Sequence, residues 1–286
     1  MQWTNLYNLP QPLVDAIMND TYEKVGDISV TGLNQPVQMR QLRQRHEAEI
    51  VEDVSDHLWR FFGQLGHELL ARSNTSNHLS EERLVETIEG LKLSGKMDLY
   101  NPETGILTDY KFTSVYSFLL GDKPEWEFQL NVYAWLLAKA GFPPKKLEIT
   151  AILKDWNRAK SRIDPDYPPV PSMTVDLPLW STEKVEGEIR KRLLAHKAAS
   201  VLPDADLPEC SPEDRWERPT TYAVKKKDAK RAFRVFESRM QAEEVAGENR
   251  MEVETRPGSS IRCEDYCPVK QFCAQYARSK QNSIAA

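Results

Sequence analysis

The stretch Gly105–Ser114, Gly-Ile-Leu-Thr-Asp-Tyr-Lys-Phe-Thr-Ser, carries an acid and an amine two residues apart. Its apolar start and its aromatic residues predict a β-strand, and side chains alternate between the two faces of a strand. Asp109 and Lys111 therefore project from the same face. A carboxylate beside an ammonium could hold a cation together with a phosphate oxygen.

A second carboxylate, Asp98, lies in the strand candidate Ser94–Tyr100, and the linker Asn101-Pro-Glu-Thr-Gly105 fits a hairpin connection. The hairpin would bring Asp98 close to Asp109. Two converging carboxylates repel each other unless a cation lies between them, and oxygen ligands suit Mg²⁺ or Mn²⁺. Taken alone, an Asp-x-Lys triplet also fits a solvent-exposed strand face. The neighbouring residues are therefore needed to decide whether the triplet belongs to a catalytic site.

Two helices are expected to position these groups. Residues 46–73 predict a helix with Ser55 as a candidate N-cap, and its apolar stripe is Leu58, Phe61, Phe62, Leu65 and Leu69. His67 lies opposite this stripe. Two glycines in the middle of the helix, Gly63 and Gly66, indicate that another backbone approaches closely. Residues 124–140 predict a buried helix with Gln129 and Tyr133 on one face. A structural role explains His67, Gln129 or Tyr133 equally well when each is taken alone.

In chain order, the motifs are His67, Gly95-Lys-Met-Asp98, Asp109-Tyr-Lys111 and Gln129-x-x-x-Tyr133. This series resembles the RecB-like exonuclease branch of the PD-(D/E)XK nuclease superfamily, over roughly residues 55–155. The resemblance implies metal ligation by His67, Asp98, Asp109 and the backbone carbonyl of Tyr110. It also implies a catalytic set formed by Asp98, Asp109, Lys111, Gln129 and Tyr133. Many relatives have Glu at the position of Asp109, and the family accepts both acids.

The fold class expected from this resemblance is α/β, with a restriction-endonuclease-like core in which helices flank a mixed central sheet. The expected organisation is an N-terminal helical and strand segment (1–54), the nuclease core (55–200) and a cysteine-containing module (201–286). Within that module, strand and helix patterns predict a small basic ββαβ insertion over residues 222–255, followed by a Cys-rich segment.

The implied activity is metal-assisted hydrolysis of phosphodiester bonds, with one or two Mg²⁺ or Mn²⁺ ions. Lys111 would orient or deprotonate the attacking water, or would stabilise negative charge on the phosphate. Nearby metal ions lower the pKa of a lysine and nearby carboxylates raise it, so the sequence leaves these roles open.

The four cysteines are Cys210, Cys263, Cys267 and Cys273, and the last three are spaced C-x3-C-x5-C. This pattern suits a [4Fe–4S] cluster, with zinc as the alternative and free thiols or disulfides as a third possibility. Several RecB-like nucleases carry an iron–sulfur cluster, but their lone cysteine usually precedes the nuclease core. Here Cys210 follows the core, so a cluster would close the loop 210–263, a constraint that contributes about 4 kcal/mol at most.

Two basic stretches are candidate nucleic-acid surfaces. The first follows a predicted core strand at 146–153 and contributes Lys154, Trp156, Arg158, Lys160 and Arg162, with the tryptophan able to stack on a base. The second, Lys225–Arg234, is expected at a hairpin tip. A solvated turn is the alternative for both.

The chain has 286 residues, 40% hydrophobic and 28% charged, with a formal charge of −5, which is the balance of a soluble globular protein. No apolar run approaches the roughly 20 residues that span a bilayer, and the first residues lack a signal-peptide pattern, so a cytoplasmic location with reduced thiols is expected. DNA is the expected partner, and local basic patches can bind it despite the acidic total. A helicase or recombination protein would have to supply unwinding, because no G-x-x-x-x-G-K-[ST] motif is present. The alternative function is a catalytically inactive nuclease fold or a zinc-type DNA-binding or assembly module.

Overall fold

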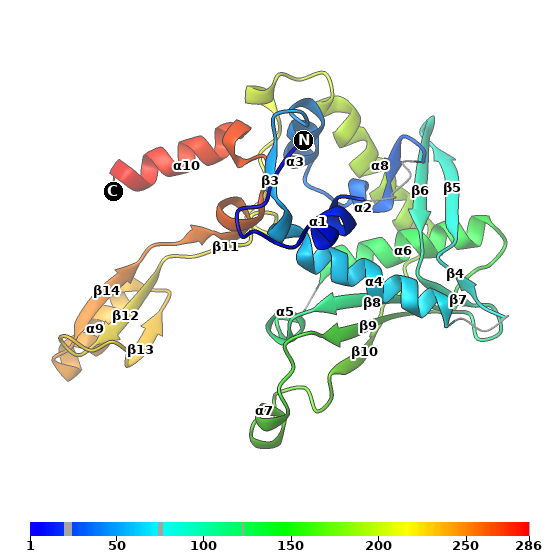
Figure 1. Cartoon of the computed structure of the whole chain (residues 1–286). Coiled ribbons are helices and arrows are strands. Elements are labelled where there is room, and N and C mark those ends of the chain that lie inside the picture. Colours follow the sequence, from blue (N-terminus) through cyan, green and yellow to red (C-terminus); the bar gives the residue numbers. More distant parts are fainter. Residues whose placement is uncertain (20–24, 74–76, 122, 286) are drawn as a thin grey trace. The chain divides into compact units, whose positions relative to one another are not determined.

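The computed structural model describes residues 1–19, 25–73, 77–121 and 123–285 (Figure 1). The chain forms two compact units. Unit 1 contains residues 1–35 and 51–200, and unit 2 contains residues 36–50 and 201–286. The segment 36–50 therefore groups with the cysteine-containing region rather than with the rest of the N-terminal segment.

Unit 1 is built on a mixed sheet that, among the described residues, has five strands in the order β10-β9-β8-β7-β4. Its strands β8 and β9 are parallel and the other pairs are antiparallel. The strand bounds are β4 (Leu79–Ser80), β7 (Leu99–Asn101), β8 (Ile106–Thr113), β9 (Lys146–Leu153) and β10 (Ser172–Leu177). A smaller sheet in the order β2-β6-β5 and a parallel pair β1-β3 complete the unit, with bounds β1 (Gln2–Thr4), β2 (Ile28–Ser29), β3 (Val51–Asp53), β5 (Arg83–Ile88) and β6 (Leu91–Lys96).

Helix α6 (Pro124–Lys139) is the crossover between the parallel strands β8 and β9. The sequence predicted a helix that is apolar nearly all round, and this prediction is confirmed. Its side chains are buried from Phe128 to Leu137, apart from Gln129, against the inward faces of β8 and β9 and against α8 (Thr182–Ala199). The central position of α6 fixes Gln129 and Tyr133 against the sheet.

The hairpin predicted at residues 101–105 is confirmed, but the strand before it is not continuous. Gly105 lies at a φ of 74°, and its N–H donates to the Asn101 carbonyl at 2.8 Å, which closes the turn between β7 and β8. The expected strand Ser94–Tyr100 divides into β6 and β7, which pair in different sheets. Asp98 lies in the connection between β6 and β7. Because it is outside both strands, its side chain does not have to follow the alternation of strand faces and can turn toward β8.

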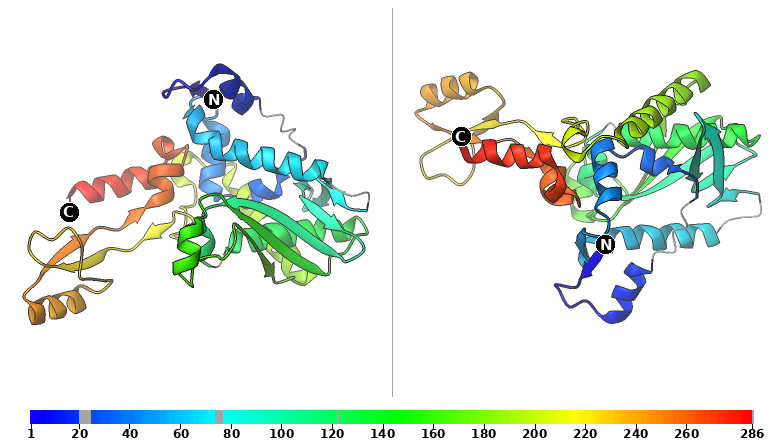
Figure 2. Two further views of the ribbon diagram at one scale, coloured as in Figure 1. Left: turned by 60° about the horizontal axis from the view of Figure 1, so that its bottom comes forward. Right: turned by 90° about the horizontal axis from the view of Figure 1, so that it is seen from above.

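Helix α4 (Leu58–Arg72) lies against β8 and carries His67 (Figure 2). The predicted helix over 46–73 is too long: a turn, strand β3 and the short helix η1 (Val54–His57) precede α4, while α3 (Val37–Arg45) forms earlier. Asp53, rather than Ser55, is the N-cap, and it caps η1 by accepting from the Ser55 N–H at 3.0 Å. The remaining helices of unit 1 are α1 (Gln11–Met18), α2 (Val30–Leu33), α5 (Val115–Leu119) and α7 (Arg158–Ile163).

Of the two mid-helix glycines, only Gly66 is explained by close approach. A Cβ at Gly66 would lie 2.0 Å from Cζ of Phe112, whereas a Cβ at Gly63 would have nothing within 4 Å. We expect Gly66→Ala to lower the free energy of unfolding by about 1–3 kcal/mol through overpacking. Gly63→Ala should raise it by about 0.5–1 kcal/mol, because alanine favours the helix.

Urea unfolding of both variants beside the wild type checks this pair, since the two substitutions are chemically identical and three residues apart. Equal changes in the two midpoints would contradict the close packing of α4 on β8.

Unit 2 contains the predicted ββαβ insertion, which the structure confirms as a sheet in the order β13-β12-β14 beside helix α9. The bounds are β12 (Thr221–Lys225), β13 (Arg234–Phe236), α9 (Arg239–Asn249) and β14 (Glu252–Arg256). A short pair, β11 (Glu217–Arg218) with β15 (Ser259–Ser260), leads to the cysteine-rich segment. The other helical elements of this unit are α3, η2 (Asp204–Asp206), η3 (Arg262–Tyr266), η4 (Lys270–Phe272) and α10 (Ala274–Ala285).

The architecture is α/β with mixed sheets flanked by helices, as the sequence predicted, and it is consistent with a restriction-endonuclease-like fold. Within the described part of the chain, no helix is both long enough and apolar enough to cross a membrane.

Candidate active site

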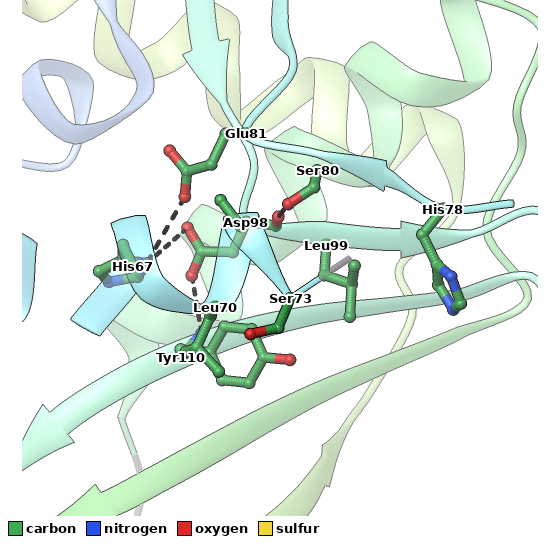
Figure 3. Close-up of a pocket in the computed structure, with 10 residues that line it drawn as sticks. His67, Leu70, Ser73, His78, Ser80, Glu81, Asp98, Leu99 and Tyr110 are labelled. Atoms are coloured by element: carbon green, nitrogen blue, oxygen red, sulfur yellow. Dashed lines mark hydrogen bonds and ion pairs between the residues drawn. The ribbon is translucent and has the colours of Figure 1, made fainter. Parts of the chain in front are cut away.

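Three side chains that can bind a metal meet in unit 1 beside the hairpin. His67 Nδ1 on α4 lies 3.3 Å from Asp98 Oδ1 and 3.7 Å from Glu81 Oε1 (Figure 3). One ligand atom from each residue falls within 4.8 Å of the others. These residues line a cavity of about 200 Å³ together with Tyr110. The three side chains come from separate elements, so only the folded chain assembles them.

A backbone hydrogen bond orients Asp98. The Tyr110 N–H donates to Asp98 Oδ2 at 2.7 Å, which leaves Oδ1 directed at His67. The N–H and C=O groups of one strand residue point to the same neighbour, so the Tyr110 carbonyl faces the same edge of β8 as Asp98. This arrangement places the carbonyl beside the carboxylate, as a ligand role would require.

Asp109 is the most deeply buried acid of the site, with 2% of its surface exposed. Burial is the largest influence and raises the pKa of its carboxyl, the charge of Lys111 opposes the rise, the charge of Asp98 adds to it, and the net pKa is about 6. Lys111 Nζ lies 2.8 Å from Asp109 Oδ2. Asp109 and Lys111 share a strand face, as predicted, and they pair directly.

Lys111 is held from the other side by α6. Its Nζ donates to Gln129 Oε1 at 3.0 Å, and Gln129 Nε2 donates to the Tyr133 hydroxyl at 3.0 Å. The ring of Tyr133 packs on Gly95, where a Cβ would lie 2.8 Å from the ring. The four residues therefore form a continuous chain, Asp109–Lys111–Gln129–Tyr133, and Gly95 leaves the space that its last ring needs.

The charge state of His67 responds to the acids around it. Burial opposes protonation, but the contacts with Asp98 and the charges of Asp109 and Glu81 outweigh it, so the pKa of His67 is raised. A bound cation would need the neutral imidazole, so it would displace this proton.

Glu81 and Lys96 are site residues that the sequence reasoning missed. Glu81 follows β4 with a positive φ of 54°, and its second oxygen forms an ion pair with Lys96 Nζ. Glu81 has no fixed spacing to Asp98 or Asp109 that would mark it as a ligand. Its position depends on the turn between β4 and β5, which only the structure reveals.

A broad groove of about 860 Å³ adjoins the site, and His67, Glu81 and Asp98 contribute to its lining. Three basic side chains, Arg72, Arg83 and Lys96, line the same groove together with the three acids Glu68, Glu81 and Asp98. Arg72 pairs with Glu68 and Lys96 pairs with Glu81, so the charges of the groove are mixed.

The predicted nucleic-acid stretch lies at the end of β9 and on α7, in unit 1. Its cations Lys154, Arg158, Lys160 and Arg162 are exposed. Trp156 is only partly exposed, because its ring packs on the cluster of Val115, Ala151 and Leu153 and its indole N–H donates to the Pro168 carbonyl at 2.8 Å. The charges of this stretch are therefore more available to a ligand than its tryptophan ring.

The four cysteines gather around one small cavity in unit 2. Burial raises the pKa of Cys210 to about 12, with further contributions from Asp214 and from the other three cysteines. The thiols of Cys210 and Cys273 both approach Gln38 Oε1, at 3.7 and 3.4 Å. Gln275 holds the backbone of Cys210 by two hydrogen bonds of 3.0 Å. All four thiols are free, so the predicted convergence does not involve disulfides.

Two acids and a lysine at a β-hairpin, together with a histidine from α4, form the kind of site that metal-dependent hydrolases use on phosphate esters. The model of the PD-(D/E)XK nuclease superfamily matches residues 13–274, so this chain belongs to that superfamily. Membership makes it a nuclease-class protein, that is, a hydrolase acting on nucleic acid.

Two solved structures resemble parts of the chain. The protein SSO0001 is 16% identical, with a TM-score of 0.43, covering 65% of this chain and 85% of its own. A phage-related exonuclease from Haemophilus somnus 129PT is 14% identical, with a TM-score of 0.30, covering 67% of this chain and 82% of its own. No curated protein matches the sequence significantly.

Proposed function

We propose that this protein is a metal-dependent deoxyribonuclease, an exonuclease that degrades linear or single-stranded DNA in recombination, repair or phage DNA metabolism. The observation that carries the proposal is the pairing of Asp109 with Lys111 at 2.8 Å, beside Asp98 and His67. Superfamily membership supports the reaction class. The exonuclease mode, the DNA substrate and the metal are proposals.

The donor set fits Mg²⁺ or Mn²⁺. His67, Glu81 and Asp98 each offer a ligand atom within 4.8 Å of the others, and Asp109 with the Tyr110 carbonyl would complete a set that could hold one or two ions. A bound ion would polarise the scissile phosphate and make a water molecule a stronger nucleophile at neutral pH. The raised pKa of Asp109 indicates a buried charge that a cation would neutralise.

The protein's own groups do the positioning. Lys111 is fixed between Asp109 and Gln129, so its ammonium could donate a hydrogen bond to the attacking water or to a phosphate oxygen as negative charge develops. Gln129 and Tyr133 hold that ammonium in place rather than react. The groove of about 860 Å³ beside the site would admit the DNA backbone, and its basic residues Arg72, Arg83 and Lys96 could contact phosphates.

For the cysteines of unit 2, we propose a [4Fe–4S] cluster, with zinc as the alternative. The proposal is supported by the four thiols, which line one cavity, and by the cysteine-rich spacing of the sequence. Unwinding of duplex DNA would need a helicase or recombination partner, because the sequence contains no phosphate-binding P-loop motif.

The test is cleavage of one plasmid, supplied as a closed circle, as a linear duplex and as heat-denatured linear strands, with Mg²⁺ or Mn²⁺. Protein would be purified without oxygen, and Lys111→Ala would be compared with the wild type. We expect the wild type to degrade linear DNA and to spare circles. Lys111→Ala should be at least about a hundredfold slower, since a donor at the reacting phosphate is lost.

Lys146→Ala is the matched control, because Lys146 lies on the neighbouring strand β9 and pairs with Glu148 and Asp176, away from the site. Cleavage of closed circles would contradict the exonuclease mode, but it would still support nuclease activity. A folded, metal-binding wild type that cleaves none of the substrates would instead support a non-catalytic DNA-binding module.

A further inference from the structure

An exposed aromatic pair lies at the beginning of α4. Trp59 is 60% exposed and Phe62 is 50% exposed, and their ring centroids are 6.0 Å apart. Their neighbours Leu58 and Phe61 instead pack on the cluster of unit 1 that contains Val14. Two large aromatic side chains that stay exposed while adjacent apolar residues are covered mark a contact surface.

A cation already lies on this surface. Lys154 Nζ is 3.8 Å from the centre of the Trp59 ring, which is a close cation–π contact. Lys154 directly follows β9, and its N–H donates to the Thr113 carbonyl at the end of β8. The next cations along the chain, Arg158 and Lys160, are exposed on α7. The surface therefore combines an aromatic face with positive charge.

The same helix connects this surface with the candidate active site. Trp59 and His67 are eight residues apart on α4, which is about 12 Å along the helix axis and little more than two turns. Stacked nucleotides of one strand advance by about 3.4 Å each, and an extended strand advances farther, so about 12 Å corresponds to two to four nucleotides.

We propose that Trp59 and Lys154 form a stacking subsite for one base of single-stranded DNA, two to four nucleotides from the scissile phosphate. This subsite rests on the proposed nuclease function. A base would stack on the indole, and the Lys154 ammonium would move from the ring to the adjacent phosphate. Aromatic faces accept any base, so the subsite would bind DNA without sequence preference.

The charge of the surface favours DNA over a second copy of this chain. Among the residues that the structure describes, the acid that acts on the charge of Lys154 is the adjacent Asp155, whose Oδ1 accepts from the Val115 N–H at 2.7 Å. Single-stranded DNA offers a base that can stack on the ring and phosphates that can pair with the cations. An apolar protein surface would leave the cations without partners. Trp156 could not replace Trp59 here, because its ring packs inward on the cluster of Val115.

The test measures binding of a fluorescein-labelled oligothymidylate by anisotropy, at fixed ionic strength and with EDTA to prevent hydrolysis. We expect Trp59→Ala to weaken binding about tenfold, within the range found for loss of one base stack. Trp59→Phe should retain most of the affinity, because it keeps an aromatic face. Leu69→Ala is the control, because Leu69 is on the same helix and is 61% exposed.

An abasic nucleotide placed at each position in turn locates the stacked base. At one position, the abasic nucleotide should lower the affinity of the wild type about tenfold and leave the affinity of Trp59→Ala unchanged. The reason is that the base and the indole ring form one interaction, which the variant has already lost. Two results would overturn the subsite. One is that the affinity losses caused by the abasic nucleotide and by Trp59→Ala add at every position, and the other is that the wild type and Trp59→Ala bind equally well. If the wild type cleaves DNA in that case, the nuclease proposal stands; a wild type that neither binds nor cleaves overturns both.

Discussion

Replacing Asp109 by asparagine should abolish hydrolysis and also make the metal-free protein more stable at pH 8. The variant removes a ligand charge, so we expect hydrolysis to fall by about a thousandfold or more. Stability should rise because the Asp109 carboxylate is 2% exposed and its pKa is raised to about 6, chiefly by burial. Asparagine has a similar shape and carries no charge to desolvate.

The sign of the pH effect follows from proton binding. Between pH 4 and 6, the unfolded chain has released the proton of Asp109, while the folded chain still holds it. This group therefore makes the wild type less stable as pH rises through that window, and above it the full cost remains. A rise of about two pH units in the pKa of Asp109 corresponds to about 3 kcal/mol and already includes the attraction of Lys111. The variant leaves the Lys111 ammonium without its partner, which offsets part of this gain, so we expect a net gain of about 1–2 kcal/mol.

Urea unfolding in EDTA at pH 4.5 and pH 8 measures this difference for the wild type and for Asp109→Asn. Asp53→Asn is a control with the opposite sign. Burial works against the Asp53 charge, but hydrogen bonds from Leu6, Ser55 and Thr4 outweigh it and lower its pKa. Asp53→Asn should therefore destabilise the protein most at neutral pH, and a stabilised Asp53→Asn beside a destabilised Asp109→Asn would refute the argument.

Metal addition gives the same variant a second readout that is independent of cleavage. A ligand at a hundred times its dissociation constant stabilises the folded state by about 2.7 kcal/mol. Mn²⁺ should therefore raise the melting temperature of the wild type and have little effect on Asp109→Asn. Without metal, Asp109→Asn would then be more stable than the wild type, and with Mn²⁺ it would be less stable. This reversal is expected where a buried charge is retained for function at a cost in folding stability.

The sequence predicted the parts of the site that depend on local periodicity. Asp109 and Lys111 share a strand face because alternation is fixed by backbone geometry, and Gln129 and Tyr133 share a helix face for the equivalent reason. The hairpin between β7 and β8 followed from its turn residues, including Gly105 at a positive φ. These features need no knowledge of distant contacts.

What the sequence did not predict depends on tertiary contacts. The separation of β6 from β7 at Asp98 arises because the two strands pair in different sheets, and no residue between them marks the change. Glu81 reaches His67 through a left-handed turn that glycine usually occupies. Helix α3 was missed because its segment, 36–50, groups with residues 201–286, far along the chain.

Replacing Cys267 by serine should remove the proposed cluster and destabilise unit 2. With the cluster present, Cys210 and Cys263 close a loop of about 50 residues, and the chain-entropy estimate for such a constraint is about 4 kcal/mol. Without it, the half-buried thiols of Cys210, Cys263 and Cys267, whose pKa values are raised by burial, would lack the metal that makes thiolates favourable there. We expect limited proteolysis to cut within residues 201–286 of the variant.

Asp265→Ser is the matched control, because Asp265 is exposed and lies between Cys263 and Cys267 in the same segment. Metal analysis of protein purified without oxygen should find about four irons per chain in the wild type and in this control, and none in Cys267→Ser. One zinc per chain would contradict the cluster and would support the zinc alternative. Unchanged proteolysis of Cys267→Ser would show that the buried contacts of Gln38 and Gln275 hold unit 2 together without any metal.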